Sequence, residues 1–162
     1  MKKIFFLISI IQLFSCQSMK NSNDYLSSNK KFYNSFYNTN GNVFMLSSPN
    51  GALSSYIWSY HNNAIDVYSF SRGKIQSKKS HKIEGQDLKW LLNPSKDDIG
   101  LDECIAMDGF TLMFKVKNNE SYVERKFPIS LECFKNTSYE TSFFKNLVQD
   151  IKSYQIGWKE VK

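Results

Sequence analysis

Apolar and polar residues alternate most regularly between residues 110 and 117. Apolar side chains occupy every second position there, and mostly polar side chains fill the positions between them. The apolar members are Phe110, Leu112, Phe114 and Val116. A period of two places the two sets on opposite faces of a strand, so the stretch predicts a β-strand with one buried face.

Further β-rich stretches lie on both sides of this strand, and short turn signals separate them. The expected strands cover residues 43–46, 53–60, 64–71, 74–83, 104–107, 121–127 and, after Pro128, 129–134. The turn signals are Asn40-Gly41, Pro49-Asn50-Gly51, His61-Asn62-Asn63 and Arg72-Gly73. Asp108-Gly109 predicts a tight hairpin. Loops this short join antiparallel strands, because a parallel return needs a longer crossover.

The end of the chain changes to a helical period. Apolar residues recur three and four positions apart, at Phe143, Phe144, Leu147, Val148, Ile151 and Tyr154. Residues 137–140 (Thr-Ser-Tyr-Glu) fit a capping box, and Gly157 lies just past the expected end. The apolar stripe predicts a helix that packs on the sheet. A helix lying on a membrane surface is the alternative, but its polar face holds Asp150 as well as Lys145 and Lys152.

Two shorter helices complete the expected fold. Asp87 can cap a helix at residues 88–92, which Pro94 would end. The pairs Phe32-Tyr33 and Phe36-Tyr37 are four positions apart and predict a short helix on the domain. The expected fold class is α+β, with an antiparallel meander of about five to seven strands and a C-terminal amphipathic helix on one face.

The beginning of the chain is patterned as a leader. Met1-Lys2-Lys3 is basic, residues 4–14 are almost entirely apolar, and Ser15 is small. This order is typical of a secretory signal peptide. The apolar run is shorter than the roughly 20 residues that cross a bilayer, and polar chain follows it at once.

The tetrapeptide Leu13-Phe14-Ser15-Cys16 resembles the lipobox of bacterial lipoproteins, although Phe14 stands where a small or β-branched residue is usual. The resemblance covers residues 1–16. It implies that Cys16 becomes the mature N-terminus and carries a thioether-linked diacylglycerol and an amide-linked acyl chain, which together anchor firmly. Gln17 stands where an Asp would commonly mark inner-membrane retention, so the resemblance implies an outer-membrane protein facing the periplasm. An ordinary cleaved signal with an incidental cysteine is the alternative.

The expected organisation is a signal peptide over residues 1–15, a lipidated cysteine with a flexible tether over 16–31, and one globular domain over 32–162. Residues 17–31 are polar and rich in Ser and Asn. Loss of the leader lowers the formal net charge from +6 to +4, which is ordinary for a small domain. Nucleic acid is not an expected partner, because Lys far outnumbers Arg and the expected location is the cell envelope.

Two cysteines remain once Cys16 is acylated. An even pair in an oxidising compartment predicts a disulfide between Cys104 and Cys133, and two buried free thiols are the alternative. Two cysteines alone make a poor metal site, since structural zinc normally takes four ligands.

No catalytic residue, metal or cofactor is expected from the motifs. His61 and His81 fit no metal-binding pattern and are expected at the surface. A carboxylate cluster precedes Cys104 at Asp97, Asp98, Asp102 and Glu103. Its spacing excludes an EF-hand, so we expect a solvated acidic loop, with a looser calcium site as the alternative.

A basic stretch overlaps the expected strand 74–83. Its members are Arg72, Lys74, Lys78, Lys79 and Lys82. They could bind an acidic partner or anionic headgroups, or they could protect an edge strand against unwanted pairing. The two interpretations are compatible, because an exposed edge is also a docking site.

The function expected from these patterns is a lipid-anchored protein of the cell envelope that binds a protein partner and is not an enzyme. A periplasmic inhibitor or an immunity-type protein is the sharpest version of this hypothesis. A structural or assembly lipoprotein of the outer membrane is the alternative. These assignments rest on analogy between small tethered domains rather than on a motif.

Mass spectrometry of the protein isolated from bacterial envelopes checks the location. We expect an N-terminal Cys16 that carries acyl groups, and a Cys16→Ser chain that remains unlipidated. An uncut chain with a bare thiol at residue 16 would contradict the envelope assignment.

Overall fold

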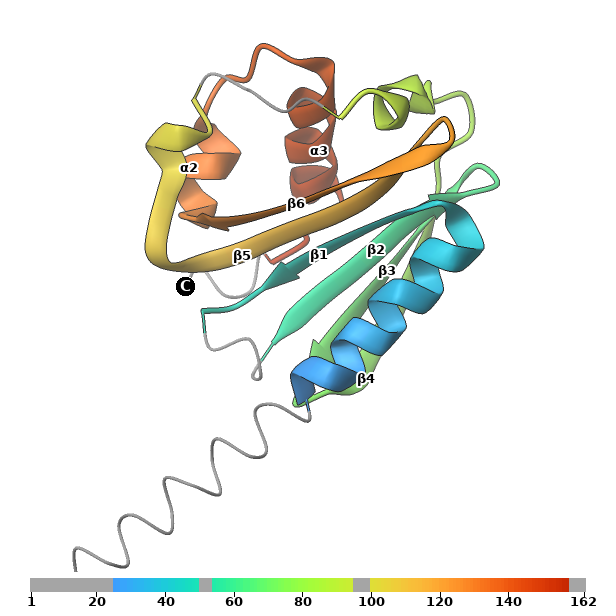
Figure 1. Cartoon of the computed structure of the whole chain (residues 1–162), viewed down its shortest axis with the longest axis horizontal. Helices are drawn as coiled ribbons and strands as arrows, with labels where there is room; N and C mark the ends of the chain where they lie inside the picture. The colour runs from blue at the N-terminus through green and yellow to red at the C-terminus, as the bar shows by residue number, and fades with distance from the viewer. Residues whose placement is uncertain (1–24, 50–53, 95–99, 158–162) are drawn as a thin grey trace, which may run out of the picture.

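The computed structural model describes residues 25–49, 54–94 and 100–157. Its centre is an open antiparallel sheet of six strands in the order β4-β3-β2-β1-β5-β6 (Figure 1). The strands are β1 (Asn42–Ser47), β2 (Ser55–His61), β3 (Ala64–Ser71), β4 (Lys74–Lys82), β5 (Ile105–Asn118) and β6 (Ser121–Ile129). The first four strands form the expected meander. The chain then returns and adds β5 beside β1.

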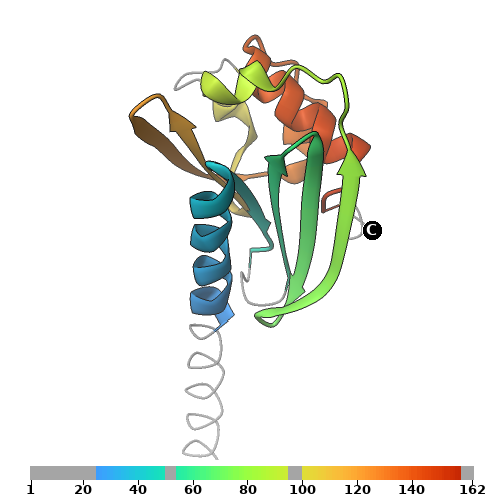
Figure 2. The same ribbon diagram turned by 90° about the vertical axis from the view of Figure 1, so that its right-hand side faces the viewer.

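Helices cover both faces of this sheet. Residues 25–40 form one helix, called here the N-terminal helix. The other face holds η1 (Leu88–Leu92), η2 (Asp102–Cys104), α2 (Leu131–Asn136) and α3 (Ser142–Ser153). Figure 2 shows the sheet between the N-terminal helix and α3. The predicted α+β class and the C-terminal helix are confirmed. Within the described ranges, no helix has the length and hydrophobicity of a membrane span.

The larger core lies between the sheet and α3. Alternate residues of the central strands point into it, among them Phe44 of β1, Trp58 of β2 and Phe114 of β5. The apolar stripe of α3 meets them, and the Phe143 ring lies 4.9 Å from the Phe114 ring, centroid to centroid. Burial of each large apolar side chain contributes about 1.5–3 kcal/mol. The stripe of α3 is therefore committed to the sheet, and a membrane-surface role for this helix is ruled out.

A smaller core lies between the sheet and the N-terminal helix. Tyr33 packs there against Val43, Ile57 and Phe70 of three strands. Phe32 extends this core, because its ring centroid lies 5.1 Å from that of Phe70. The expected helix around residues 32–37 is confirmed, and it is longer than predicted.

The tether prediction is wrong for residues 25–31, which belong to the N-terminal helix. Asn29 is 3% exposed, and its Nδ2 donates to Ser55 Oγ at 3.2 Å. Asn29 precedes Tyr33 by one helical turn, so both side chains face the sheet. The polar composition concealed this face, because its buried contact is a hydrogen bond rather than an apolar one. Residues 16–24 lie outside the described residues.

The hairpin predicted at Asp108-Gly109 does not form. Residues 105–118 make one continuous strand, and its register with β6 shifts so that both Ile105 and Phe110 pair with Ile129. Gly109 is needed for close approach, because a Cβ there would collide with the carbonyl oxygen of Ile129. The dipeptide therefore serves a bulge in β5 rather than a turn.

Local capping corrects two further boundaries. The strand expected at residues 129–134 gives way to α2, because Ser130 caps a helix by accepting from Cys133 N at 3.5 Å. Thr141, rather than the predicted capping box, caps α3 by accepting from Phe144 N at 3.5 Å. Asp87 caps η1 as expected and accepts from Lys89 N at 2.9 Å.

Cys104 and Cys133 form the predicted disulfide, with Cα atoms 5.4 Å apart. It joins the end of η2 to α2 and closes a loop with a sequence separation of 29. The backbone reinforces the junction, since Ser130 N donates to Cys104 O at 2.8 Å. The covalent link holds the start of β5 against the segment that follows β6.

Replacement of both cysteines by serine is expected to lower the free energy of unfolding by about 3–4 kcal/mol, because the open loop gains entropy in the unfolded state. Urea unfolding with and without reductant measures this loss. Reductant should shift the midpoint of the wild type and leave that of the double variant unchanged. Equal wild-type midpoints in both conditions would contradict the stabilising role.

Candidate functional site

The predicted basic residues lie on or beside one free edge of the sheet. Strand β4 is the last strand in the sheet order, and its one partner among the described residues is β3. Nearly all of its residues are exposed. The five predicted residues are Arg72, Lys74, Lys78, Lys79 and Lys82, called here the β4 patch. Arg72 stands in the turn before β4 with a positive φ of 50°.

The pleat divides the lysines of β4 between the two faces of the sheet. Lys78 pairs in register with Tyr68, whose ring lies 4.9 Å from that of Phe32 in the N-terminal helix. Lys79 pairs with Val67, which belongs to the core under α3. Adjacent lysines therefore reach opposite sides of the edge. The structure gathers the predicted residues along one edge but not on one face.

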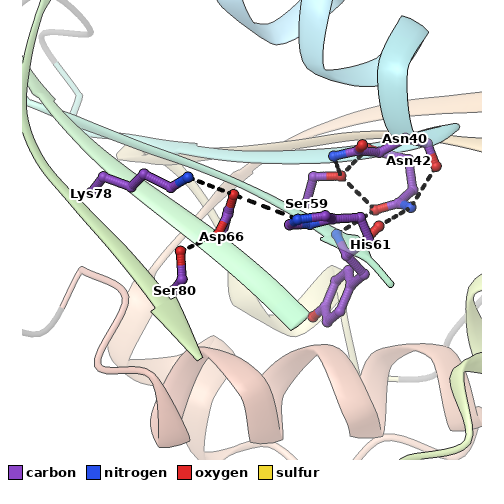
Figure 3. A network of polar contacts seen from close by, with 8 residues as sticks. Asn40, Asn42, Ser59, His61, Asp66, Lys78 and Ser80 are labelled. Atoms are coloured by element: carbon purple, nitrogen blue, oxygen red, sulfur yellow. Dashed lines mark hydrogen bonds and ion pairs between the residues drawn. The ribbon is translucent and has the colours of Figure 1, made fainter. Parts of the chain in front are cut away.

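Asp66 of β3 neutralises one member of the patch. Lys78 Nζ lies 3.0 Å from its carboxylate, and the Ser80 hydroxyl donates to the same carboxylate (Figure 3). His61 Nε2 lies 3.8 Å away. Burial alone would raise the pKa of Asp66, but the Ser80 hydrogen bond and then Lys78 outweigh it and hold the pKa below its ordinary value. Lys78 is thus held in place by a buried carboxylate.

The remaining cations of the patch differ in whether they form an ion pair. Lys82 forms an exposed ion pair with Glu84 at 3.6 Å. Within the part of the chain that the structure describes, Arg72, Lys74 and Lys79 have no ion-pair partner. These three side chains, together with the free backbone of β4, can contact another molecule without breaking an internal ion pair.

A second polar network beside the patch has a structural role. Asn40 Nδ2 donates to Ser59 Oγ at 3.0 Å, and Ser59 Oγ donates to Asn42 O at 2.6 Å (Figure 3). Asn42 then exchanges two hydrogen bonds with the backbone of Tyr60, at 3.0 and 2.9 Å. These bonds fasten the end of the N-terminal helix to β1 and β2.

The other residues named from the sequence lie apart from the patch or outside the described ranges. The His81 ring lies 4.8 Å from the Tyr154 ring, centroid to centroid. Asp102 and Glu103 begin η2, whereas Asp97, Asp98 and Cys16 fall outside the described residues. Within those residues no group of three side chains is placed to hold a metal ion.

A buried carboxyl in the other core was missed from the sequence. Asp150 of α3 is 7% exposed, and the Tyr60 hydroxyl donates to it. It lines a cavity of about 490 Å³ between η1 and α3, together with Trp90, Asn146 and Gln149. Burial raises the pKa of Asp150 from 3.8 to about 6, and the Tyr60 hydrogen bond opposes this only in part.

Helical spacing could have revealed this position. Asp150 lies three residues after Leu147 and four before Tyr154, both members of the apolar stripe. The expectation that Asp150 lies on the polar face of the helix is therefore wrong, because it is buried beside the stripe, where the Tyr60 hydroxyl is its partner.

Comparison of the chain with models of known protein families, with curated proteins and with solved structures finds no match.

The raised pKa of Asp150 predicts that the free energy of unfolding falls as the pH rises. Its folded-state pKa of about 6 exceeds the ordinary value of 3.8, so folding favours the protonated form. Between pH 4 and pH 7 the wild type should therefore lose up to about 3 kcal/mol relative to Asp150→Asn. Urea unfolding across this range measures the difference. A constant difference between the two proteins would contradict the raised pKa.

Proposed function

We propose that the protein is a lipid-anchored, non-catalytic binding module of the cell envelope, of the inhibitor or immunity type. In this proposal Cys16 carries the lipid and a protein partner docks along β4. The observation that carries the proposal is the exposed edge strand β4 together with Arg72, Lys74 and Lys79, which have no ion-pair partner among the described residues. The anchor and the location rest on the resemblance of residues 1–16 to a lipoprotein leader.

The chemistry of the edge identifies the kind of partner. An extended segment can add to β4 through main-chain hydrogen bonds, and its side chains would alternate between the two faces. Lys74 and Lys79 would attract carboxylates on such a segment, and long-range attraction would speed its encounter. The partner is therefore an acidic protein that presents an extended strand.

A structural or assembly lipoprotein of the outer membrane is the second candidate, and the distance to the anchor favours it. Eight residues separate Cys16 from residue 25, where the N-terminal helix is already packed on the sheet. Even a fully extended chain of that length spans at most about 30 Å. The domain would then work close to the membrane surface, where a membrane complex is within reach.

Charge reversal on β4 tests the proposal. We expect Lys74→Glu combined with Lys79→Glu to reduce capture of the partner from envelope extracts about tenfold at low salt. The two lysines attract carboxylates of the partner, and glutamates in their place would repel them. The control is Lys145→Glu on the exposed face of α3, which should capture as much as the wild type. Added salt should weaken wild-type capture.

The identity of the captured protein separates the two candidates. One soluble acidic protein supports the inhibitor type, and a membrane complex supports assembly. Equal capture by the wild type and the β4 variant would show that the lysines only protect the edge, and the docking proposal would fail.

A further inference from the structure

A cavity of about 630 Å³ lies on the opposite side of the sheet from α3, and its lining includes no residue of the β4 patch. The N-terminal helix forms one wall through Asn29 and Tyr33, and Met45 and Met113 of the sheet form the floor. Lys30 and Lys126 also line it, together with Glu124. It is called here the helix-side cavity.

Two buried polar atoms in its wall have no hydrogen-bond partner among the described residues: Asn29 Oδ1 and the Tyr33 hydroxyl. Their residues are 3% and 1% exposed. A buried polar group without a partner is costly, so such groups are rare in folded proteins. Trp58 Nε1, His61 Nδ1 and His81 Nε2 are also buried without a partner among the described residues. Asn29 and Tyr33 differ from them because they lie one helical turn apart and line the same cavity, which points to a bound molecule that supplies both partners.

The neighbouring groups determine whether Asn29 Oδ1 and the Tyr33 hydroxyl act as hydrogen-bond acceptor or donor. Asn29 Nδ2 donates to Ser55 Oγ at 3.2 Å, and Ser55 Oγ donates to Ser47 Oγ at 3.1 Å. The Asn29 amide is thereby oriented, and its Oδ1 remains an acceptor. Burial, and then the charge of Glu124, raise the pKa of Tyr33 far above its ordinary value. Tyr33 therefore stays a neutral phenol that can donate its proton.

A secondary amide matches this pair. It has one N–H for Asn29 Oδ1 and one C=O for the Tyr33 hydroxyl. Asn29 and Tyr33 are four residues apart, so their side chains leave the same face of the helix. The N–H and C=O of a trans amide point in opposite directions, so an amide between the two side chains can bond both.

The rest of the cavity indicates what flanks the amide. Leu26, Met45 and Met113 offer apolar surface for a hydrocarbon chain, and methionine adapts to irregular shapes. Lys30 and Lys126 outnumber the single carboxylate of Glu124, so the site favours an anionic group. We propose that the helix-side cavity binds a small N-acylated amino acid or a similar anionic amphiphile with a secondary amide.

Calorimetric titration tests the proposal with two matched probes. N-octanoylglycine carries the amide, and octanoyloxyacetic acid carries an ester in its place, so it lacks the N–H donor. The protein is the mature chain from residue 16 to 162 with Cys16→Ser, which keeps every described residue without an attached lipid. The amide should bind about tenfold more tightly than the ester, because only the amide satisfies Asn29 Oδ1.

The Tyr33→Phe variant separates a binding role from a structural one. Without ligand, loss of an unpartnered buried hydroxyl should raise the melting temperature by about 2–4 °C. The same change should weaken N-octanoylglycine binding about tenfold. Tyr37→Phe is the control on the same helix. Its ring contacts Tyr122 and Lys115 rather than the cavity, so it should alter neither binding nor the site.

Several results would overturn the proposal. If neither probe binds, another segment of this chain fills the cavity or the cavity takes different chemistry. Equal binding of amide and ester would remove the role of Asn29 Oδ1. A lower melting temperature for Tyr33→Phe with unchanged binding would show that the hydroxyl is structural. Each result is independent of the β4 edge, so it leaves the docking proposal untouched.

Discussion

Burial of the central strands on both faces is the constraint on which the rest of the structure depends. Val43 and Phe44 are consecutive residues of β1, their side chains point to opposite faces, and both are fully buried. Antiparallel sheets commonly leave one face to water. Here each face needs its own cover, and the covers come from opposite ends of the chain, the N-terminal helix and α3. Both faces of the sheet are buried only when the N-terminal helix and α3 have packed on them.

The positions of Asp66 and Asp150 on opposite faces of the sheet also explain why their pKa values shift in opposite directions. Asp66 lies near the open edge, where the Ser80 hydroxyl and Lys78 can reach it, and its pKa is lowered. Asp150 lies under η1, where its one donor within the described residues is the neutral Tyr60 hydroxyl, and its pKa is raised. Burial opposes ionisation of both carboxyls. The Ser80 hydrogen bond, and then Lys78, outweigh burial at Asp66, whereas the Tyr60 hydroxyl offsets burial at Asp150 only in part.

Period-two and helical patterns predicted most of the sheet and α3, because those elements bury apolar faces that the sequence displays directly. Burial through polar contacts was not visible in the same way. Asn29 lies in a polar stretch that gives no sign of burial, whereas Asp150 shows its position only through its spacing from the apolar stripe. Each makes a buried hydrogen bond to a strand distant in sequence. Local turn chemistry misled at Asp108-Gly109, since the same dipeptide suits a tight turn and a close backbone approach. The tertiary partner, Ile129, decides between them.

The candidate site was predictable in composition but not in arrangement. The five basic residues of the β4 patch all lie within residues 72–82, so their gathering on one edge follows from the meander. Neutralisation of Lys78 depends on Asp66, which pairs in register with Ser80 of β4. No pattern within β4 alone contains that information.

The N-terminal helix connects the features that the sequence treats as separate. It begins within nine residues of the proposed lipid anchor, covers the second face of the sheet and supplies Asn29 and Tyr33 to the helix-side cavity. A flexible tether through residue 31 would uncouple the anchor from the domain. A helix packed from residue 25 instead leaves a short span between the anchor and the cavity wall. The first residue of this helix, Tyr25, also lies against Gly73 in the turn between Arg72 and Lys74, where an added Cβ would be 3.1 Å from Tyr25 Cα. The helix-side cavity and the start of β4 are therefore both next to the helix that follows the proposed anchor.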